Sequence, residues 1–491
     1  MLPVLLLKPL SLQKRNLRKN NLKFVGIRIP LFRIPTFLQV NMEQLKLRSK
    51  SFLNSYYYPL FVFAAALISH TFSIEVFGIS CLALTACIGF LLCEDIKFFI
   101  SPLIAFILMF SQKSVATGIF YSTGYIVAIV VFAVILFSLI VAHFIIYRKK
   151  KDFIGFYKSK LFWGFVALSG ALILNGFFNF DEYVFGNIAF SFVLVISFFG
   201  IFFLFRTGLH SSTDLRNYLF YVLYLISILV TLQLYLSFIF QIQIVDGAIV
   251  KESIMVGWGM WNNVGGMLAF LLPTHFYFAT VSKKCGYLFY FSGLISYFAI
   301  VLSLSRSSLL VSTGIIVVCA LVSCFKGDNK KTNRIITGAI TIVGIIGVIV
   351  LWDKISSVLN DYLSRGLDDN GRFDIYRRGW ENFLNNPVFG GGFHSAKAQD
   401  HTFIIFLPDR YHNTVIQLLG TCGIVGLLAY CFHRYQTVIL LWKKRCLFTA
   451  FSALCIGAFL LTSLLDNHFF NIYPCFIYSI MMSVLDVTDN K

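Results

Sequence analysis

The stretch YIVAIVVFAVILFSLIVAHFIIY, from Tyr125 to Tyr147, contains no Lys, Arg, Asp or Glu. A helix needs about 20 consecutive apolar residues to cross the hydrocarbon core of a bilayer. Backbone groups in lipid must be hydrogen-bonded within their own segment, so such a stretch is expected to be helical. Similar segments recur along the 491 residues, of which 58% are hydrophobic and 13% charged. The sequence therefore predicts an all-α, polytopic transmembrane helical bundle.

About 12–14 spans are expected. Fourteen apolar segments lie near 56–72, 75–93, 97–110, 119–147, 161–178, 185–205, 217–242, 261–281, 285–305, 307–325, 335–352, 413–433, 446–465 and 470–487. The segment at 97–110 is short and the turn at 305–307 is very tight, so twelve spans is the alternative. The chain is accordingly divided into a basic cytoplasmic segment (1–55), a transmembrane bundle (56–352), an external loop (353–412) and three C-terminal spans (413–487).

The net charge of +19 is concentrated between the apolar segments. With the N-terminus in the cytoplasm, every basic cluster falls on the cytoplasmic side, which is the positive-inside pattern of membrane proteins. The charge thus indicates a bilayer partner rather than nucleic acid. Residues 1–41 make a poor signal peptide, and Met42 is an alternative start. The eleven cysteines show neither a disulfide framework nor paired zinc spacing, and no metal is expected.

The external loop contains one clear helical pattern, in NGRFDIYRRGWENFLNNPVFGGGF. Apolar residues at helical spacing form one face, which is expected to rest on the membrane or on the bundle; they are Phe373, Tyr376, Trp380, Phe383 and Leu384. Pro387 is expected to end this helix, and Gly390 to Gly392 to form a flexible turn.

Three arginines belong to the same helix. Arg377 can pair with Glu381 and Arg378 with Asp374, because residues four apart share a helix face. Arg372 has no such explanation, since it falls in the first turn, where the helix dipole disfavours a cation. A cation is useful there if an anion binds beside it, with backbone N–H groups contributing.

Two further titratable residues fall at the expected outer membrane edge. Arg306 separates two apolar spans, and a buried cation usually faces a polar cavity; the alternative is a side chain that extends to lipid phosphates. His412 precedes the span at 413–433. The alternative to a functional role for His412 is that of a solvated or capping histidine.

The residues after His412 indicate a tightly packed helix. Asn413 can cap the span that follows. Gly420, Gly423 and Gly426 are spaced by three and would let another helix approach closely, which would fix the direction of His412.

Weaker candidates occur at other outer edges. Asn262 and Asn263 stand at a span entrance and suit either helix capping or a polar rim that faces sugar. Asp466 and His468 occur in LLDNHFF at another edge.

Arg306, Arg372 and His412 together suggest one chemistry. Cations at a membrane rim suit a pyrophosphate anchored in lipid, and a histidine suits removal of a proton from a sugar hydroxyl. Glycosyl transfer from a lipid pyrophosphate needs both functions. Substrate contacts are expected from Asn413, Arg377, Arg378, Asn262 and Asn263.

From about 262 to 466 the chain resembles the O-antigen ligase and polysaccharide polymerase superfamily of membrane glycosyltransferases. The ligase-type pattern is matched by His412-Asn413, nine residues, Gly423, two residues and Gly426. Further motifs of the family are matched by Ser305-Arg306, Gly371-Arg372, Trp380, Asn386-Pro387 and Gly390 to Gly392.

The resemblance implies transfer of a glycan from undecaprenyl pyrophosphate to a glycan or glycolipid acceptor, outside the cytoplasmic membrane. No metal, cofactor or nucleotide sugar is implied. By match, Arg306 and Arg372 would hold the pyrophosphate, and His412 would assist the acceptor. Ligases and repeat-unit polymerases share these residues, so the motifs do not separate the two. The family usually has twelve spans.

A flippase or transporter of lipid-linked sugars is the alternative from another class. It would place charges or broken helices near the bilayer midplane and would show repeated halves. The charged candidates of this chain lie at the expected outer rim instead.

Overall fold

The structure, a computed structural model, describes residues 36–111, 123–177, 179, 185–211, 213–245, 248–250, 253–350, 352–353, 356, 371–393 and 408–488. Contacts divide the chain into two units, Met1–Leu47 and Arg48–Lys491. Most of the expected basic N-terminal segment and large parts of the expected external loop lie outside the described residues. The fold discussed below is that of the second unit.

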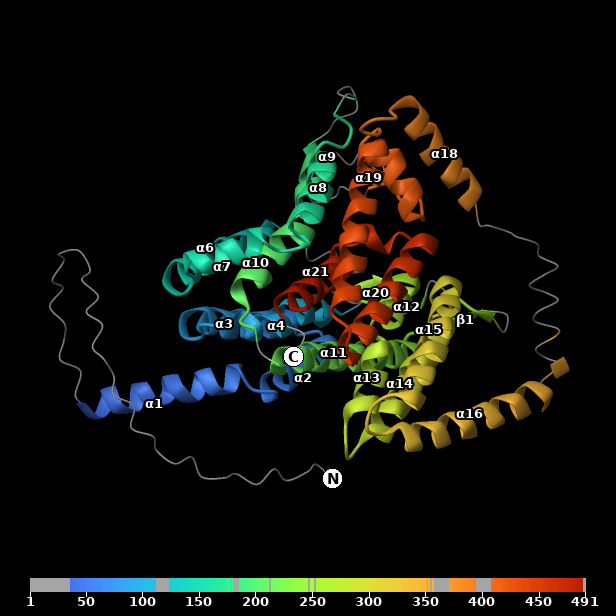
Figure 1. Cartoon of the computed structure of the whole chain (residues 1–491), viewed down its shortest axis with the longest axis horizontal. Helices are drawn as coiled ribbons and strands as arrows, with labels where there is room; N and C mark the ends of the chain where they lie inside the picture. Colours follow the sequence, from blue (N-terminus) through green and yellow to red (C-terminus); the bar gives the residue numbers. More distant parts are fainter. Residues whose placement is uncertain are drawn as a thin grey trace. The chain divides into compact units, whose positions relative to one another are not determined.

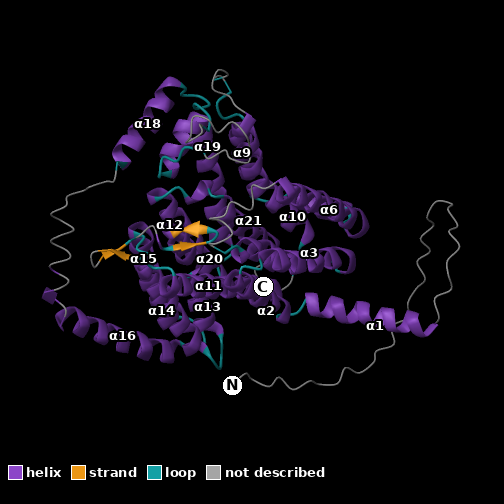
Figure 2. Ribbon diagram, turned by 180° about the vertical axis from the view of Figure 1, so that it is seen from behind, coloured by secondary structure: helices purple, strands orange, loops and turns teal. Residues whose placement is uncertain are grey.

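Helices make up nearly all of the described chain (Figures 1 and 2). In chain order they are α1 (Thr36–Leu53), α2 (Tyr57–Phe72), α3 (Glu75–Leu92), η1 (Ile96–Phe99), α4 (Ile100–Ala105), η2 (Phe106–Met109), α6 (Thr123–Tyr147), α7 (Lys150–Tyr157), α8 (Phe162–Ile173), α9 (Phe185–Val195), η5 (Ile196–Gly200), α10 (Ile201–Gly208), α11 (Thr213–Phe240), α12 (Trp261–Leu271), α13 (Pro273–Val281), α14 (Gly286–Leu302), α15 (Arg306–Phe325), α16 (Lys330–Val350), α18 (Arg372–Asn385), α19 (Thr414–Lys443), α20 (Leu447–Leu465), η7 (His468–Phe470) and α21 (Ile472–Val487). Two antiparallel hairpins join β1 (Ile244–Val245) to β2 (Ala248–Ile249) and β3 (Met255–Val256) to β4 (Gly259–Met260). The predicted all-α fold is confirmed.

The expected spans differ in length. Each of the fourteen apolar segments overlaps at least one helix. In the described residues, nine helices are long and apolar enough to cross a membrane, or up to ten if a bent pair at α1 and α2 is one span. Four further apolar helices are shorter: Ile96–Met109, Phe162–Ile173, Gly286–Leu302 and Ile472–Val487.

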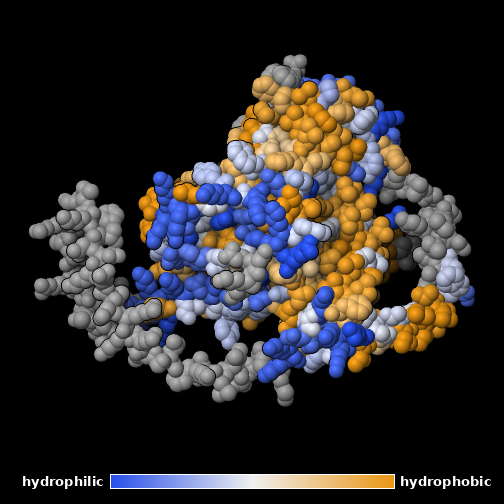
Figure 3. All heavy atoms as spheres, viewed as in Figure 1, coloured by the Kyte–Doolittle hydropathy of each residue, from blue (hydrophilic) through white to orange (hydrophobic). Residues whose placement is uncertain are grey.

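The centre of the bundle is formed by α12 and α13. In the apolar stretch Trp261–Val281, which contains α12 and α13, 89% of the 18 residues that best suit a membrane span are buried. The corresponding share in Lys330–Val350, which is α16, is 6%. A helix that is apolar all round and unburied by protein is suited to contact lipid. Hydrophobic residues accordingly cover the later part of α16, after its basic first turns, and much of the visible surface over α9 and α19 (Figure 3). The α12 helix packs on α15 and α20, which carry parts of the site described below.

Helix α19 is broken at Gly423, where φ is 65° and ψ is −160°. The break exposes backbone groups that a continuous helix would use. The loop after α18 satisfies them, since Gly391 N donates to Gly420 O (2.9 Å) and Ile424 N donates to Pro387 O (2.9 Å). Broken helices occur at membrane depth only where such groups are paired. Gly390 to Gly392, expected to form a flexible turn, therefore belong to a loop that is hydrogen-bonded to the break in α19.

The three glycines of α19 play different parts, which corrects the expectation of one packing stripe. A Cβ on Gly420 would lie 2.9 Å from Gly379 O of α18, so these two helices approach closely. Gly423 breaks the helix, and a Cβ there would lie 2.4 Å from Val388 O of the loop after α18. A Cβ on Gly426 would first meet Cys422 Cβ of its own helix, at 2.3 Å.

The aromatic face of α18 does not lie against the bundle. Gly379 faces α19 and is the buried residue of this helix. Phe373, Trp380 and Leu384 are exposed by 65%, 46% and 60%. This face is expected to rest either on the membrane or on the bundle. The exposure of these three side chains excludes the bundle for them. The helix ends at Asn385, as the following Pro387 predicted.

Candidate active site

The C-terminal end of α20 receives donors from two other helices. Arg372 Nη1 donates to Leu465 O (2.9 Å). Asn413 Nδ2 donates to Leu464 O (2.9 Å), and Thr414 Oγ1 donates to Ser463 O (2.8 Å). The last carbonyls of a helix lack intrahelical partners and carry its negative end. The starts of α18 and α19 are thereby fixed at the end of α20.

His412 and Asp466 meet at this junction. His412 Nδ1 lies 2.8 Å from Asp466 Oδ1. The side chain of His412 is 34% exposed and that of Asp466 is 12% exposed, so the histidine faces outward and the carboxylate lies behind it. The ring of His412 is thus partly solvated and also bound to a carboxylate.

The carboxylate of Asp466 is held in its charged form. Burial raises the pKa of Asp466, but the hydrogen bond from His412 and the charges of His468, His412 and Arg372 lower it more strongly, to about 2. A buried carboxylate at the end of a helix would otherwise be disfavoured. Its negative charge therefore depends on the basic residues around it.

The backbone at His412 adopts a sparsely populated conformation. Its φ is 47°, in the left-handed region, where non-glycine residues are uncommon. The next residue, Asn413, caps α19, because its Oδ1 accepts from Val415 N (2.8 Å) and Ile416 N (3.2 Å). The predicted cap is confirmed. The left-handed turn directs the His412 ring toward Asp466 while Asn413 starts the helix.

His468 lies on the inner side of the same turn. It is 3% exposed, and a Cβ on Gly266 of α12 would lie 2.4 Å from its Nε2. Burial lowers the pKa of His468, against the raising effect of Asp466. The glycine in the middle of α12 thus provides the space that this histidine occupies.

Arg306 belongs to a turn that also lies near α12. It is the first residue of α15, after Ser305 at the N-cap and after Leu304, whose φ is 55°. A Cβ on Gly265 would lie 2.9 Å from Ser308 Oγ. Since Gly265 and Gly266 are neighbours, the turn with Arg306 and the turn with His468 approach adjacent residues of α12. The structure brings Arg372, His412 and Asp466 together, and places Arg306 next to the same stretch of α12.

The remaining sequence candidates lie around this cluster. Arg377 pairs with both Asp374 (3.4 Å) and Glu381 (3.7 Å) on exposed parts of α18. The expected pair of Asp374 with Arg378 is wrong, because Arg377 lies between the two carboxylates. Asn263 Oδ1 accepts from Asn471 Nδ2 (3.3 Å).

Asn262 is half-buried at the start of α12. In the described part of the chain, neither Asn262 nor Asn263 forms a hydrogen bond with His412. Among the residues that the structure covers, no three His, Cys, Asp or Glu side chains are grouped to hold a metal ion.

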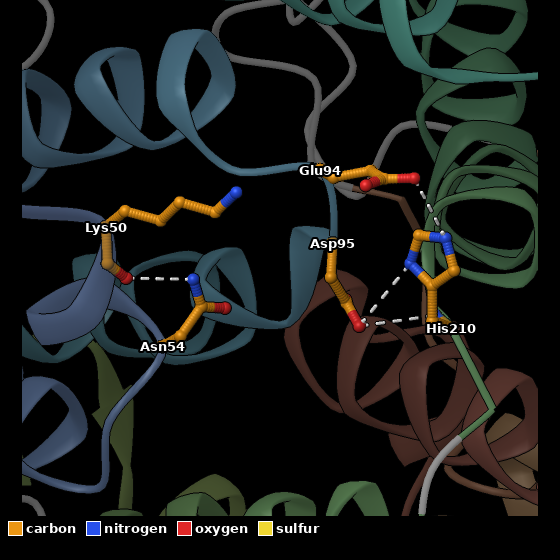
Figure 4. A pocket seen from close by; sticks show the side chains of 5 residues that line it. All are labelled: Lys50, Asn54, Glu94, Asp95 and His210. Carbon is orange, nitrogen blue, oxygen red and sulfur yellow. Dashed lines mark hydrogen bonds and ion pairs between the residues drawn. The ribbon is translucent and has the colours of Figure 1, made fainter. Parts of the chain in front are cut away.

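A separate cavity of about 380 Å³ lies elsewhere in the second unit (Figure 4). His210 reaches Glu94 (Nε2–Oε1, 3.6 Å) and Asp95 (Nδ1–Oδ2, 3.7 Å) across it. The hydrogen bond to Asp95 raises the pKa of His210. Lys50 and Asn54 complete the lining. It shares no residue with the cluster at α20.

Asp466 is among the weaker candidates of the sequence, where it stands with His468 at an expected outer edge, but its partner His412 is not evident there. Gln417 carries no signal in the sequence, since a glutamine within the first turns of an apolar helix does not show its partners.

Residues 291–431 match the family described as O-antigen ligase. The matched segment includes Arg306, Arg372 and His412 and ends before Asp466. No curated protein matches the chain. This matched segment lies within a bundle of apolar helices and supports membership of the O-antigen ligase/polymerase superfamily.

Proposed function

We propose that this protein is a glycosyltransferase of the O-antigen ligase type. It would transfer a glycan from undecaprenyl pyrophosphate to an acceptor glycan or glycolipid in surface polysaccharide biosynthesis. The observation that carries the proposal is the contact between His412 and Asp466 beside Arg372. This cluster combines a histidine that faces outward, a carboxylate that orients it and a guanidinium.

His412 would act as the general base. A carboxylate that accepts from Nδ1–H leaves the lone pair on Nε2. Nε2 would remove the proton of an acceptor hydroxyl as that oxygen attacks the anomeric carbon of the donor. The bond from this carbon to the phosphate oxygen breaks, and its electron pair leaves with undecaprenyl pyrophosphate. Asp466 would stabilise the resulting imidazolium.

Arg372 and Arg306 would hold the pyrophosphate. A guanidinium carries five N–H donors, so the bond from Arg372 to Leu465 O leaves others for an anion. Both arginines stand at the first residue of a helix, where backbone N–H groups and the dipole favour negative charge. The reaction proposed here requires no metal, because the arginines stabilise the leaving group.

The location follows from the distribution of charge. Basic clusters between the spans favour a cytoplasmic face for both termini, with the cluster at α20 on the external face of the cytoplasmic membrane. Asn413, Arg377, Arg378, Asn262 and Asn263 remain proposed substrate contacts. For Asn413 the structure also offers a structural role, since both ends of its amide are bonded within the protein.

The test is the chain-length profile of lipid-linked and surface glycan in a deletion strain, with the wild-type or the His412→Ala gene restored. Full-length chains that remain on undecaprenyl pyrophosphate would support a ligase. Single repeat units without long chains would instead identify a repeat-unit polymerase. Glycan retained on the inner leaflet would identify a flippase and overturn the proposal.

A further inference from the structure

Gln417 connects the two loops that meet at the active site. It lies in the second turn of α19 and is 1% exposed. Its Oε1 accepts from Tyr411 N (3.0 Å) and also from Asn467 Nδ2. Its Nε2 donates to Asp409 O (3.1 Å). One buried amide thus bonds to the segment just before His412 and to the residue just after Asp466.

We propose that Gln417 is a positioning residue that fixes His412 relative to Asp466. This inference rests on the proposed function, in which that pair removes the acceptor proton. Among the described residues, Gln417 forms no hydrogen bond with the His412 ring or with the Asp466 carboxylate. It acts through Tyr411 and Asn467, each adjacent to one member of the pair.

The backbone of His412 explains why such a connection is required. A left-handed conformation at a histidine persists only where surrounding contacts hold it. Tyr411 is held at both ends, since its N–H bonds to Gln417 and its OH accepts from Asn382 Nδ2 of α18 (2.5 Å). Without the Gln417 amide, the N–H of Tyr411 and the amide of Asn467 would lose their acceptor in a buried place. The remaining bonds, from Asn413, Thr414 and Arg372 to the end of α20, hold Ser463 to Leu465 but reach neither Tyr411 nor Asn467.

The bundle offers a matched control for Gln417. Gln233 is also fully buried, at 0% exposure. Its Nε2 donates to Leu108 O (2.5 Å) and its Oε1 accepts from Trp258 Nε1 (2.9 Å). Replacing either glutamine with methionine preserves side-chain length and removes a buried amide. Of these two glutamines, only Gln417 forms hydrogen bonds with residues adjacent to His412 and Asp466.

The experiment compares the full-length Gln417→Met, Gln233→Met and Asn467→Ala proteins with wild type in one detergent. The first readout is the ¹⁵N spectrum of histidine-labelled protein, with the His412 signals identified by their loss in His412→Ala. The second readout is kcat and KM with lipid-linked glycan extracted from the deletion strain. Thermal melting of each variant measures the loss of stability.

Wild-type His412 is expected to show a protonated Nδ1 and an unprotonated Nε2. Gln417→Met is expected to give mixed tautomers and a kcat about 10- to 100-fold lower, the scale of a misplaced catalytic group. KM should change much less. Gln233→Met should lose comparable stability without altering the His412 signals. Asn467→Ala, which removes one of the bonds without changing α19, should show the same spectral change to a smaller degree.

Unchanged His412 signals in both Gln417→Met and Asn467→Ala would overturn the inference. An equal spectral change in Gln233→Met would also overturn it, because the effect would then be general destabilisation. Altered His412 signals with an unchanged kcat would support the positioning by Gln417. The same result would overturn His412 as the base, so failure of the inference and failure of the proposed function are distinguishable.

Discussion

His412 Nδ1 lies 2.8 Å from Asp466 Oδ1, although 54 residues separate them in sequence. The contact joins the start of α19 to the end of α20. It sets the tautomer of the imidazole, since a proton on Nδ1 leaves Nε2 as an acceptor. The histidine is the more exposed member of the pair, and the more buried member, Asp466, carries the negative charge.

Replacing the two members of this pair should affect the rate unequally. His412→Ala removes the proposed base, and kcat should fall by about 10²- to 10⁴-fold, the usual contribution of general base catalysis. Asp466→Asn keeps a hydrogen-bonding group of similar size but removes the charge, so its loss should be smaller. The measurement is turnover of lipid-linked glycan extracted from the deletion strain. His210→Ala, which changes the separate cavity, serves as the control.

Asp466 should also make stability depend on pH. Its pKa is lowered from 3.8 to about 2 in the folded protein. A lowered carboxylate pKa stabilises the fold at pH values above the unfolded pKa, and this contribution is lost as the pH falls through the folded pKa. The difference in melting temperature between wild type and Asp466→Asn should be largest above about pH 4 and should shrink toward pH 2. A difference that stays constant over this range would contradict the ionised carboxylate.

The positions of the helices could be predicted because apolar length alone determines a membrane span. Length varies among these segments: in the part of the chain that the structure describes, nine or ten helices are long enough to cross and four further apolar helices are shorter. Residues 97–110 form three short helices, η1, α4 and η2. An apolar segment can be buried in lipid or in protein. Hydropathy alone therefore does not distinguish a membrane span from a short helix buried in the bundle.

The site could be predicted only in part. His412, Arg372 and Arg306 were identifiable because charged groups at a membrane edge need an explanation. Asp466 could not be paired with His412, because that contact depends on how α19 packs against α20. The break at Gly423 was equally hidden, since the spacing of three glycines indicates close packing and does not specify a backbone conformation.

The break in α19 gives a prediction about stability. A side chain at Gly423 would meet strain from φ 65° and ψ −160° and would place its Cβ 2.4 Å from Val388 O. Gly423→Ala should therefore destabilise the protein by several kcal/mol, more than the about 1–3 kcal/mol of backbone strain alone. Gly457→Ala in α20 is the control, because nothing lies within 4 Å of its Cβ position. That substitution should be neutral or stabilising, by up to about 1 kcal/mol. Melting temperatures in one detergent compare the two, and equal values would contradict a required break.

Arg372 should affect donor binding through both its charge and its shape. Its guanidinium bonds to Leu465 O and, in the proposed function, also to the pyrophosphate. Arg372→Ala should raise KM for the lipid-linked donor by about tenfold or more, the scale of a charged hydrogen bond. Arg372→Lys should fall between wild type and alanine, because an ammonium keeps the charge but lacks the planar fork that binds two acceptors. Arg445 lies before the opposite end of α20, where its guanidinium stacks on Trp442 and donates to Trp442 O (3.2 Å), so Arg445→Ala should leave KM for the donor unchanged. If Arg372→Ala and Arg445→Ala gave the same KM, the guanidinium of Arg372 would be confined to holding the end of α20, and the anion would have to be bound elsewhere.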